Sequence, residues 1–304
     1  MSQLKFCLIT PSYQRDFARC RLLAESVDRF ATSKIHHYII VDRRDLKLFK
    51  QLESDRRTII TVESILPWWI YKIPLVKNGW FSWKTLPIRN WLIQQIVKLE
   101  IANHLKEDVL IFVDSDVVFI RSFSGEQFSQ NNKVRLFRIL DDSLSSVNNV
   151  ELQSKWYHTA NSVLGLPPFK EFDRHHPFFR YVGNCISWKR DNVLLLHDRI
   201  ERITQKSWIE AIANSWHFSE YILYGIFVDR ILQEKSGHYW DSQQIAYGYW
   251  GTKPLSKEQL QVFLQNMSPQ HRAVMISAKS KMAVADYASL LDFDRFGDSI
   301  SQNC

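Results

Sequence analysis

The sequence predicts an α/β fold built on a mainly parallel sheet flanked by helices. Residues 109–113 (Val-Leu-Ile-Phe-Val) form an apolar run without polar alternation, which is typical of a strand buried on both faces. The first forty residues follow the order strand, polar turn, helix, strand, which opens a βαβ unit and favours parallel pairing. The composition, 45% hydrophobic and 23% charged, is that of a globular protein and excludes a disordered chain.

The first predicted elements are a strand over residues 4–10, which Pro11 ends, and a second strand over residues 37–41. Asp16 is placed to cap the helix between them. Apolar residues recur at helical spacing in that helix, at Phe17, Cys20, Leu23, Ala24 and Val27.

Proline and tryptophan interrupt the pattern at residues 66–90, which we predict to be an aromatic loop region. A helix over residues 90–105 then leads into the apolar strand. Later predictions are strands at 134–140, 181–188 and 273–278, an irregular segment at 143–180, and helices at 191–206, from 220 with Ser219 as its cap, and at 257–267.

Charge, cysteine pattern and hydropathy limit the ligands and the cellular location that we expect for the protein. The net charge of +7 is spread along the chain, without a basic tract long enough for a nucleic-acid arm, and it favours anionic ligands or an inner membrane surface. The four cysteines lack zinc or disulfide spacing, which indicates a reducing cytoplasmic location. We expect no signal peptide or membrane span, and a single domain over residues 1–304.

Two carboxylates follow the apolar strand directly, at Asp114 and Asp116, with Ser115 between them. In an extended backbone, side chains two residues apart leave on the same side, so these carboxylates repel each other unless a cation neutralises them. Hard divalent ions such as Mg²⁺ or Mn²⁺ prefer oxygen ligands of this kind. The sequence therefore predicts a metal site at the carboxyl end of a core strand.

Polar residues also follow the first two strands, at Thr10–Tyr13 and at Asp42–Asp45. The carboxyl ends of parallel strands meet at one edge of a sheet, where ligands of open α/β sheets bind. We therefore expect all three polar segments to collect at one edge.

An apolar strand running into Asp-Ser-Asp resembles the DxD motif of GT-A-fold glycosyltransferases, and the chain is thereby predicted to have a GT-A-like (Rossmann-like) sheet with a DxD motif at a central strand end. In that family the motif holds a divalent metal that bridges the diphosphate of a sugar nucleotide. The resemblance implies that Asp116 binds the metal and acts in catalysis. Asp114 would serve the ribose, or the metal through water.

The resemblance extends to most of the chain, from about Leu4 to Lys281, and as a whole the sequence is similar to an uncharacterised bacterial group known mainly as a domain of unknown function. It implies a nucleotide-binding half at about 1–125, an acceptor half at about 126–285 and a tail at 286–304. Nucleotide contacts would then come from Thr10, Pro11, Ser12, Tyr13, Arg15, Asp42, Lys98, Asp114 and Ser115.

One departure concerns the metal. Many metal-dependent members supply a third ligand from a histidine near the C-terminus, but the corresponding segment here, residues 276–281, has none. Lys279 and Lys281 lie there instead, and we expect them to hold the diphosphate as point charges. His238 and His271 lie outside the segment and are expected to be structural or surface residues.

The acceptor side is assigned to the later part of the chain. In inverting members a carboxylate from this region deprotonates the acceptor hydroxyl, and Glu220 is the expected base; a helix-start glutamate favoured by the helix dipole is the alternative. Gly183, Asn184 and Trp188 are expected to line the acceptor site, with glycine allowing close approach and tryptophan stacking on a sugar. The expected partners are a nucleoside-diphosphate sugar and a glycan or glycolipid acceptor.

Two other classes of protein stay open. Asp114-Ser115-Asp116-Val117-Val118 also fits the signature of haloacid-dehalogenase-like phosphatases, in which the first aspartate accepts the phosphoryl group. That fold normally begins with this motif, whereas here a long α/β segment precedes it. The third class is a non-catalytic sugar- or nucleotide-binding protein. Only 9 glycines are present and no glycine-rich phosphate loop, which argues against Rossmann dinucleotide and P-loop sites.

Overall fold

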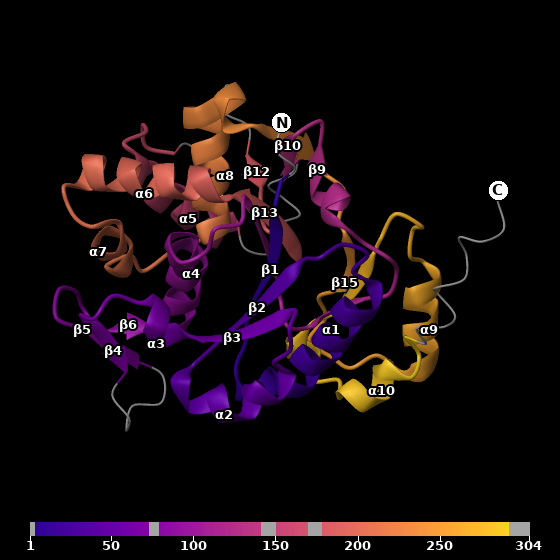
Figure 1. Ribbon diagram of the computed structural model, residues 1–304. Helices are drawn as coiled ribbons and strands as arrows, with labels where there is room; N and C mark the ends of the chain where they lie inside the picture. Colours follow the sequence, from indigo (N-terminus) through magenta and orange to yellow (C-terminus); the bar gives the residue numbers. More distant parts are fainter. Residues whose placement is uncertain (1–3, 73–78, 141–149, 170–177, 292–304) are drawn as a thin grey trace.

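The computed structural model describes residues 4–72, 79–140, 150–169 and 178–291, and a five-stranded sheet lies at its centre (Figure 1). The strand order is β13 (Cys185–Lys189), β7 (Val109–Val113), β1 (Phe6–Pro11), β2 (His36–Val41) and β3 (Arg57–Thr61). The last four are parallel, and β13 pairs with β7 in the antiparallel sense. The predicted α/β class and mainly parallel sheet are confirmed.

Helices cover both faces of this sheet, because strand residues alternate between the two sides. On one face, α1 (Phe17–Phe30) packs Leu23 and Val27 against Leu8 of β1. On the other, α4 (Asn90–Glu100) packs Ile93 and Ile96 against the sheet. Every residue of β7 is buried, as expected for a strand covered on both sides.

A second sheet begins where the central one ends. The order is β15 (Ala246–Tyr249), β16 (Ala273–Ile276) and β8 (Val117–Phe119), with β16 antiparallel to β8. Since β8 follows β7 after three residues, the Asp-Ser-Asp turn lies at the junction of the two sheets. This junction fixes both aspartates between strands of buried residues.

Two predictions about irregular segments are wrong. Residues 66–90 hold a three-stranded antiparallel sheet, β4 (Ile70–Lys72), β5 (Gly79–Ser82) and β6 (Ile88–Arg89). Residues 143–180 hold the helix α5 (Val150–Leu164). Its second half does show helical spacing of apolar residues, at Trp156, Tyr157, Ala160, Val163 and Leu164, but polar residues between them obscure the pattern. Residues 141–149 and 170–177 lie outside the described part.

The other elements follow the predictions more closely. The helix predicted from residue 220 is α8 (Glu220–Ile226), and the Ser219 hydroxyl accepts the Ile222 N–H as a cap. A π-helix over Phe227–Leu232 continues it. Asp16 takes the N-cap position of α1 but makes no side-chain capping bond, and its carboxylate pairs with Arg19. The remaining bounds are α2 (Leu46–Phe49), α3 (Val62–Ile65), β9 (Ser129–Gln130), β10 (Lys133–Phe137), β11 (Ile139–Leu140), β12 (Phe179–Arg180), α6 (Arg190–Thr204), α7 (Trp208–Ala213), β14 (His238–Asp241), α9 (Lys257–Gln265) and α10 (Val284–Ala288).

Three cysteines, Cys7, Cys20 and Cys185, are buried free thiols. Of the tail predicted at 286–304, the end of α10 is described and residues 292–304 are outside the described part. Among the helices that the structure describes, none has both the length and the apolar character that a membrane crossing requires.

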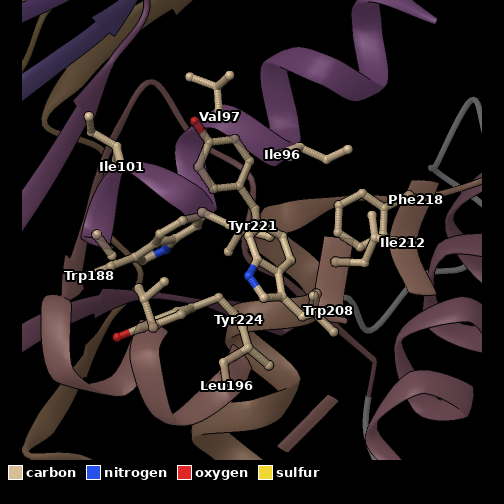
Figure 2. Packing of buried hydrophobic residues seen from close by; sticks show 14 of the residues in the cluster. Ile96, Val97, Ile101, Trp188, Leu196, Trp208, Ile212, Phe218, Tyr221 and Tyr224 are labelled. Atoms are coloured by element: carbon tan, nitrogen blue, oxygen red, sulfur yellow. The ribbon is translucent and has the colours of Figure 1, made fainter. Parts of the chain in front are cut away.

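An aromatic core joins α4, α6, α7 and α8 beside the central sheet (Figure 2). Trp188 of β13 stacks on Tyr224 with ring centroids 4.7 Å apart, and it also contacts Phe112. On the far side, His197 of α6 stacks flat against Trp208 at 4.1 Å. This core fixes α8 against α4, and both helices carry residues of the candidate site.

His197 makes the stability of this core sensitive to pH. It is 5% exposed, and burial lowers its pKa to about 3. Because the folded pKa lies below the ordinary value near 6.5, the unfolded chain binds the extra proton. Stability is therefore complete above about pH 6.5 and falls as the pH drops toward 3, by up to about 1.4 kcal/mol per pH unit. We expect His197→Phe to reduce this slope in urea unfolding measured from pH 4 to 7.

The matched control for that experiment is His158→Phe, which replaces an exposed histidine on α5. The same slope in His197→Phe and in the unchanged protein would contradict a neutral, buried His197.

Candidate functional site

The Asp-Ser-Asp turn is held from both sides. The Val117 N–H donates to the Asp114 carbonyl oxygen at 3.1 Å and closes the turn. The Ala278 N–H, two residues after the end of β16, donates to Asp116 Oδ2 at 3.0 Å. Burial, and then the charge of Asp114, raise the pKa of Asp116 to about 6. The turn is therefore a fixed, partly buried concentration of negative charge.

The chemistry of this turn fits a hard divalent ion, although the protein offers few ligands. In the described part of the chain, no group of three or more His, Cys, Asp or Glu side chains could hold a metal. Two carboxylates alone leave most of the coordination to water or to a ligand's oxygens, as Mg²⁺ sites in phosphate-transferring proteins commonly do. A cation there would relieve the repulsion that raises the pKa of Asp116.

The two histidines considered above lie elsewhere. His238 is buried, with its Nε2 2.7 Å from the Tyr224 hydroxyl and its Nδ1 2.9 Å from the Val134 carbonyl oxygen. His271 Nδ1 accepts the Ser268 N–H. Both roles are structural, as predicted.

Lys98 and Glu220 form a buried ion pair behind Asp114. Lys98 Nζ donates to Glu220 Oε1 at 3.0 Å and to the Tyr221 hydroxyl at 2.8 Å, and it lies 3.8 Å from Asp114 Oδ1. Burial by itself lowers the pKa of Lys98, but Tyr221, Glu220 and Asp114 together raise it well above its usual value. Lys98 is therefore charged and joins the start of α8 to the Asp-Ser-Asp turn.

Glu220 is enclosed by this arrangement. It is 4% exposed, and its backbone N–H donates to Gln95 Oε1 at 3.1 Å. A general base must lie within hydrogen-bond reach of the hydroxyl that it deprotonates. In this structure the carboxylate faces Lys98 rather than solvent. The two residues are 122 positions apart in the sequence, so no local pattern predicts their contact.

The ends of β1 and β2 border the turn. In the parallel register Ile9 pairs with Phe112, so Pro11 lies beside Asp114. Next to these ends is an open pocket of about 340 Å³. Its lining comes from β1, β2, α4 and the aromatic sheet, and includes Pro11, Ser12, Tyr13, Ile40, Asp42, Arg44, Val62, Trp80, Asn90, Trp91, Ile93, Gln94 and Val97.

The predicted residues of this edge differ in their accessibility. Ser12 Oγ is buried, with no hydrogen-bond partner among the described residues, whereas Tyr13 and Arg15 are exposed. Asp42 is paired with Lys72 and with Arg44, at 3.1 Å for the latter. Thr10 is fully buried, and its hydroxyl lies 2.9 Å from His37 Nε2. Its side chain therefore does not reach the pocket.

The other predicted residues surround the turn at different depths. Lys279 and Lys281 are exposed on the turn after β16, next to the Ala278 N–H that holds Asp116. Ser115 is buried. In the antiparallel register Cys185 faces Val113, which places Asn184 beside Asp114. Asn184 Oδ1 is buried, without a partner among the described residues.

The two other acceptor residues serve packing. Trp188 is 1% exposed in the aromatic core, so no sugar can stack on it in this structure (Figure 2). Gly183 lies against Phe137 and Ile186, where a Cβ would come within 3.2 Å of each side chain. Arg44 belongs to the polar segment Asp42–Asp45 that was expected here, whereas Trp80, Asn90, Trp91 and Gln94 are pocket residues that the sequence analysis missed. The tryptophan-rich composition of their segment was the available signal.

The fold and the turn define the chain as an α/β protein with an acidic site at the carboxyl edge of its sheet. It belongs to the family of unknown function DUF6492, whose pattern matches residues 4–253. No curated protein matches the sequence. Among solved structures, the crystal structure of an active-site mutant of LgtC is similar, with a TM-score of 0.47 and 11% identity over 89% of this chain and 87% of that one. At this level the similarity carries no argument about activity.

Proposed function

We propose that the protein is a metal-assisted glycosyltransferase of GT-A-like fold that moves a sugar from a nucleoside diphosphate to a hydroxyl of a glycan or glycolipid. The observation that carries the proposal is the fixed Asp114–Asp116 turn at the carboxyl end of β7, beside the pocket at the ends of β1 and β2. A nucleotide needs such a pocket for its base and ribose, and its diphosphate needs a cation.

Each part of the site has a task in this proposal. Asp114 and Asp116 hold Mn²⁺ or Mg²⁺, which as a Lewis acid would stabilise the leaving diphosphate. Pro11, Ser12 and Tyr13 border the donor. Asp42 faces the ribose or base, with its charge balanced by Lys72 and Arg44. Lys279 and Lys281, on the turn after β16, would bind the diphosphate as point charges.

Glu220 has two possible tasks, and its surroundings favour one. The sequence-based role as base requires access by the acceptor hydroxyl, but the carboxylate is 4% exposed. Its ion pair supports a positioning role, in which Glu220 holds Lys98 near Asp114 and so fixes the turn. Asn184, whose amide oxygen lacks a partner among the described residues, lies beside Asp114 and is the polar group that we assign to the acceptor.

The donor is tested by thermal unfolding with UDP or GDP, with and without Mn²⁺. A ligand present at a hundredfold excess over its dissociation constant stabilises by about 2.7 kcal/mol, which raises the melting temperature by roughly 5 °C. We expect this increase only when nucleotide and metal are both present, followed by release of the nucleoside diphosphate from the matching sugar nucleotide.

The other two classes give different outcomes in the same experiment. Release of phosphate from aryl phosphates, without nucleotide stabilisation, would assign the site to a phosphatase. Nucleotide stabilisation without turnover across sugar donors and acceptors would assign it to a binding protein.

A further inference from the structure

An exposed aromatic and cationic surface lies beside the pocket, on the small sheet β4–β5–β6. Residues 64–99 contain no aspartate or glutamate, although acidic residues number 32 in the chain. Five of the 11 tryptophans fall between positions 68 and 91. In Figure 1 this sheet lies at the edge of the molecule, on the side away from α9 and α10.

Large apolar side chains of this sheet point into solvent. Trp68 is 82% exposed, Trp83 73% and Leu86 74%. Their backbone is fixed, because the Trp83 N–H donates to the Trp69 carbonyl oxygen at 3.1 Å and the strands pair in register. These side chains could therefore move into the protein core only if the sheet unfolded. An exposed apolar patch of this kind marks an interaction site.

Cations accompany these side chains. The Arg89 guanidinium lies 4.3 Å from the ring of Trp216, which is itself 71% exposed, and it donates to the Trp216 carbonyl oxygen. The Lys84 side chain is 45% exposed, and its ion-pair partner among the described residues is Glu210 at 3.8 Å. We call Trp68, Trp83, Lys84, Leu86, Arg89 and Trp216 the tryptophan face.

We propose that the tryptophan face docks the protein onto the anionic surface of a lipid bilayer. Tryptophan favours the membrane–water interface, where its apolar ring and its N–H are both satisfied. Lysine and arginine bind the anionic headgroups that surround it. Carboxylates orient sugars in protein sites by accepting hydroxyl hydrogen bonds. Residues 64–99 have none, and Glu210, which the structure places at the tryptophan face, is already paired with Lys84 at 3.8 Å. That composition favours a bilayer over a glycan as the partner.

Docking there would bring the site to the membrane. Trp91 lines the candidate pocket, and its ring centroid lies 5.9 Å from the guanidinium carbon of Arg89, which belongs to the tryptophan face. If the protein is the proposed transferase, its acceptor would be a sugar carried on a lipid. Only this statement about the acceptor rests on the proposed function. The docking itself does not depend on that activity.

The test is co-sedimentation of the full chain with vesicles of phosphatidylcholine, alone or with one third phosphatidylglycerol. We expect binding to the anionic vesicles that weakens in high salt. The variant Lys84→Gln with Arg89→Gln, which removes both charges, is expected to lose about thirtyfold in affinity, since each cation contributes roughly fivefold. Trp68→Ala with Trp83→Ala is expected to lose at least as much.

The matched control is Trp250→Ala, which removes a 60% exposed tryptophan elsewhere on the surface and is expected to bind as the unchanged protein does. Circular dichroism melting verifies that each variant is folded. Equal binding to neutral and anionic vesicles, or full binding by the Trp68/Trp83 variant, would overturn the proposal. Quenching of tryptophan fluorescence by soluble oligosaccharides, lost in the same variants, would assign the face to a glycan instead.

Discussion

Replacing Asp116 with asparagine is expected to abolish sugar transfer and, at the same time, to make the metal-free protein more stable. Asparagine keeps the shape and can still accept the Ala278 N–H, so the turn stays in place. The substitution removes one of the two carboxylates on which the proposed metal depends. We expect turnover to fall at least about a hundredfold, and stabilisation by nucleotide with Mn²⁺ to disappear.

The gain in stability follows from the pKa of Asp116, which burial and Asp114 raise to about 6. An acid whose folded pKa lies above its unfolded value is harder to ionise in the folded state. The resulting penalty is absent below about pH 4, grows as the pH rises and is complete above pH 6, where it amounts to about 2 to 3 kcal/mol. Urea unfolding at pH 8 and at pH 4 measures it, and the gain is expected only at pH 8.

The control is Asp108→Asn, at the opposite end of β7, where the carboxylate accepts the Lys5 N–H at 2.8 Å. That variant is expected to lose some stability and to keep its metal response. If Asp116→Asn still turned over sugar nucleotide and still responded to Mn²⁺, the metal assignment would be wrong.

Local sequence patterns predicted those elements whose residues, adjacent in the sequence, are buried together or cap one another. The all-apolar Val109–Val113 predicted β7, and Ser219 predicted the start of α8. These signals are short-range. The helix α5 escaped prediction because polar residues interrupt its apolar positions from Trp156 to Leu164. The helices that bury those positions, α8 and α6, come later in the chain.

The candidate site was predictable only where residues lie at a strand end. Asp114 and Asp116 could be found because the strand before them is unmistakable. The contact between Lys98 and Glu220 joins two helices across the core, and no local pattern encodes it. Thr10 was predicted to contact the nucleotide because it lies near a strand end. That position does not fix the side to which its side chain points, and its hydroxyl contacts His37 instead. Asn184 lies beside Asp114 only because β13 runs antiparallel to β7.

Breaking the ion pair between Lys98 and Glu220 is expected to cost stability in a strongly non-additive way. Both side chains are buried, so Lys98→Met leaves a carboxylate without its cation, and Glu220→Gln leaves an ammonium without its full counter-charge. Each single change is expected to destabilise the protein by about 3 kcal/mol. The double variant is expected to recover much of this loss, because it removes both buried charges.

The comparison pair is Lys50 and Glu53, which make an ion pair of 2.7 Å at the surface. Water screens that pair, so Lys50→Met is expected to change the free energy of unfolding by less than about 1 kcal/mol. A coupling energy between Lys98 and Glu220 as small as the surface value would contradict the buried pair that the structure describes.

The same cycle separates the two roles of Glu220 when turnover is measured beside stability. A catalytic base acts on the acceptor hydroxyl, so Glu220→Gln would depress kcat by 10²-fold or more with donor affinity unchanged, as general acid–base effects of about 10² to 10⁴ imply. Removing Lys98 as well would not restore the rate. A positioning residue acts through Lys98 on Asp114, 3.8 Å away. In that case donor and metal affinity fall together in each single variant, and the double variant loses no more than either one. The burial of Glu220 leads us to expect the second result.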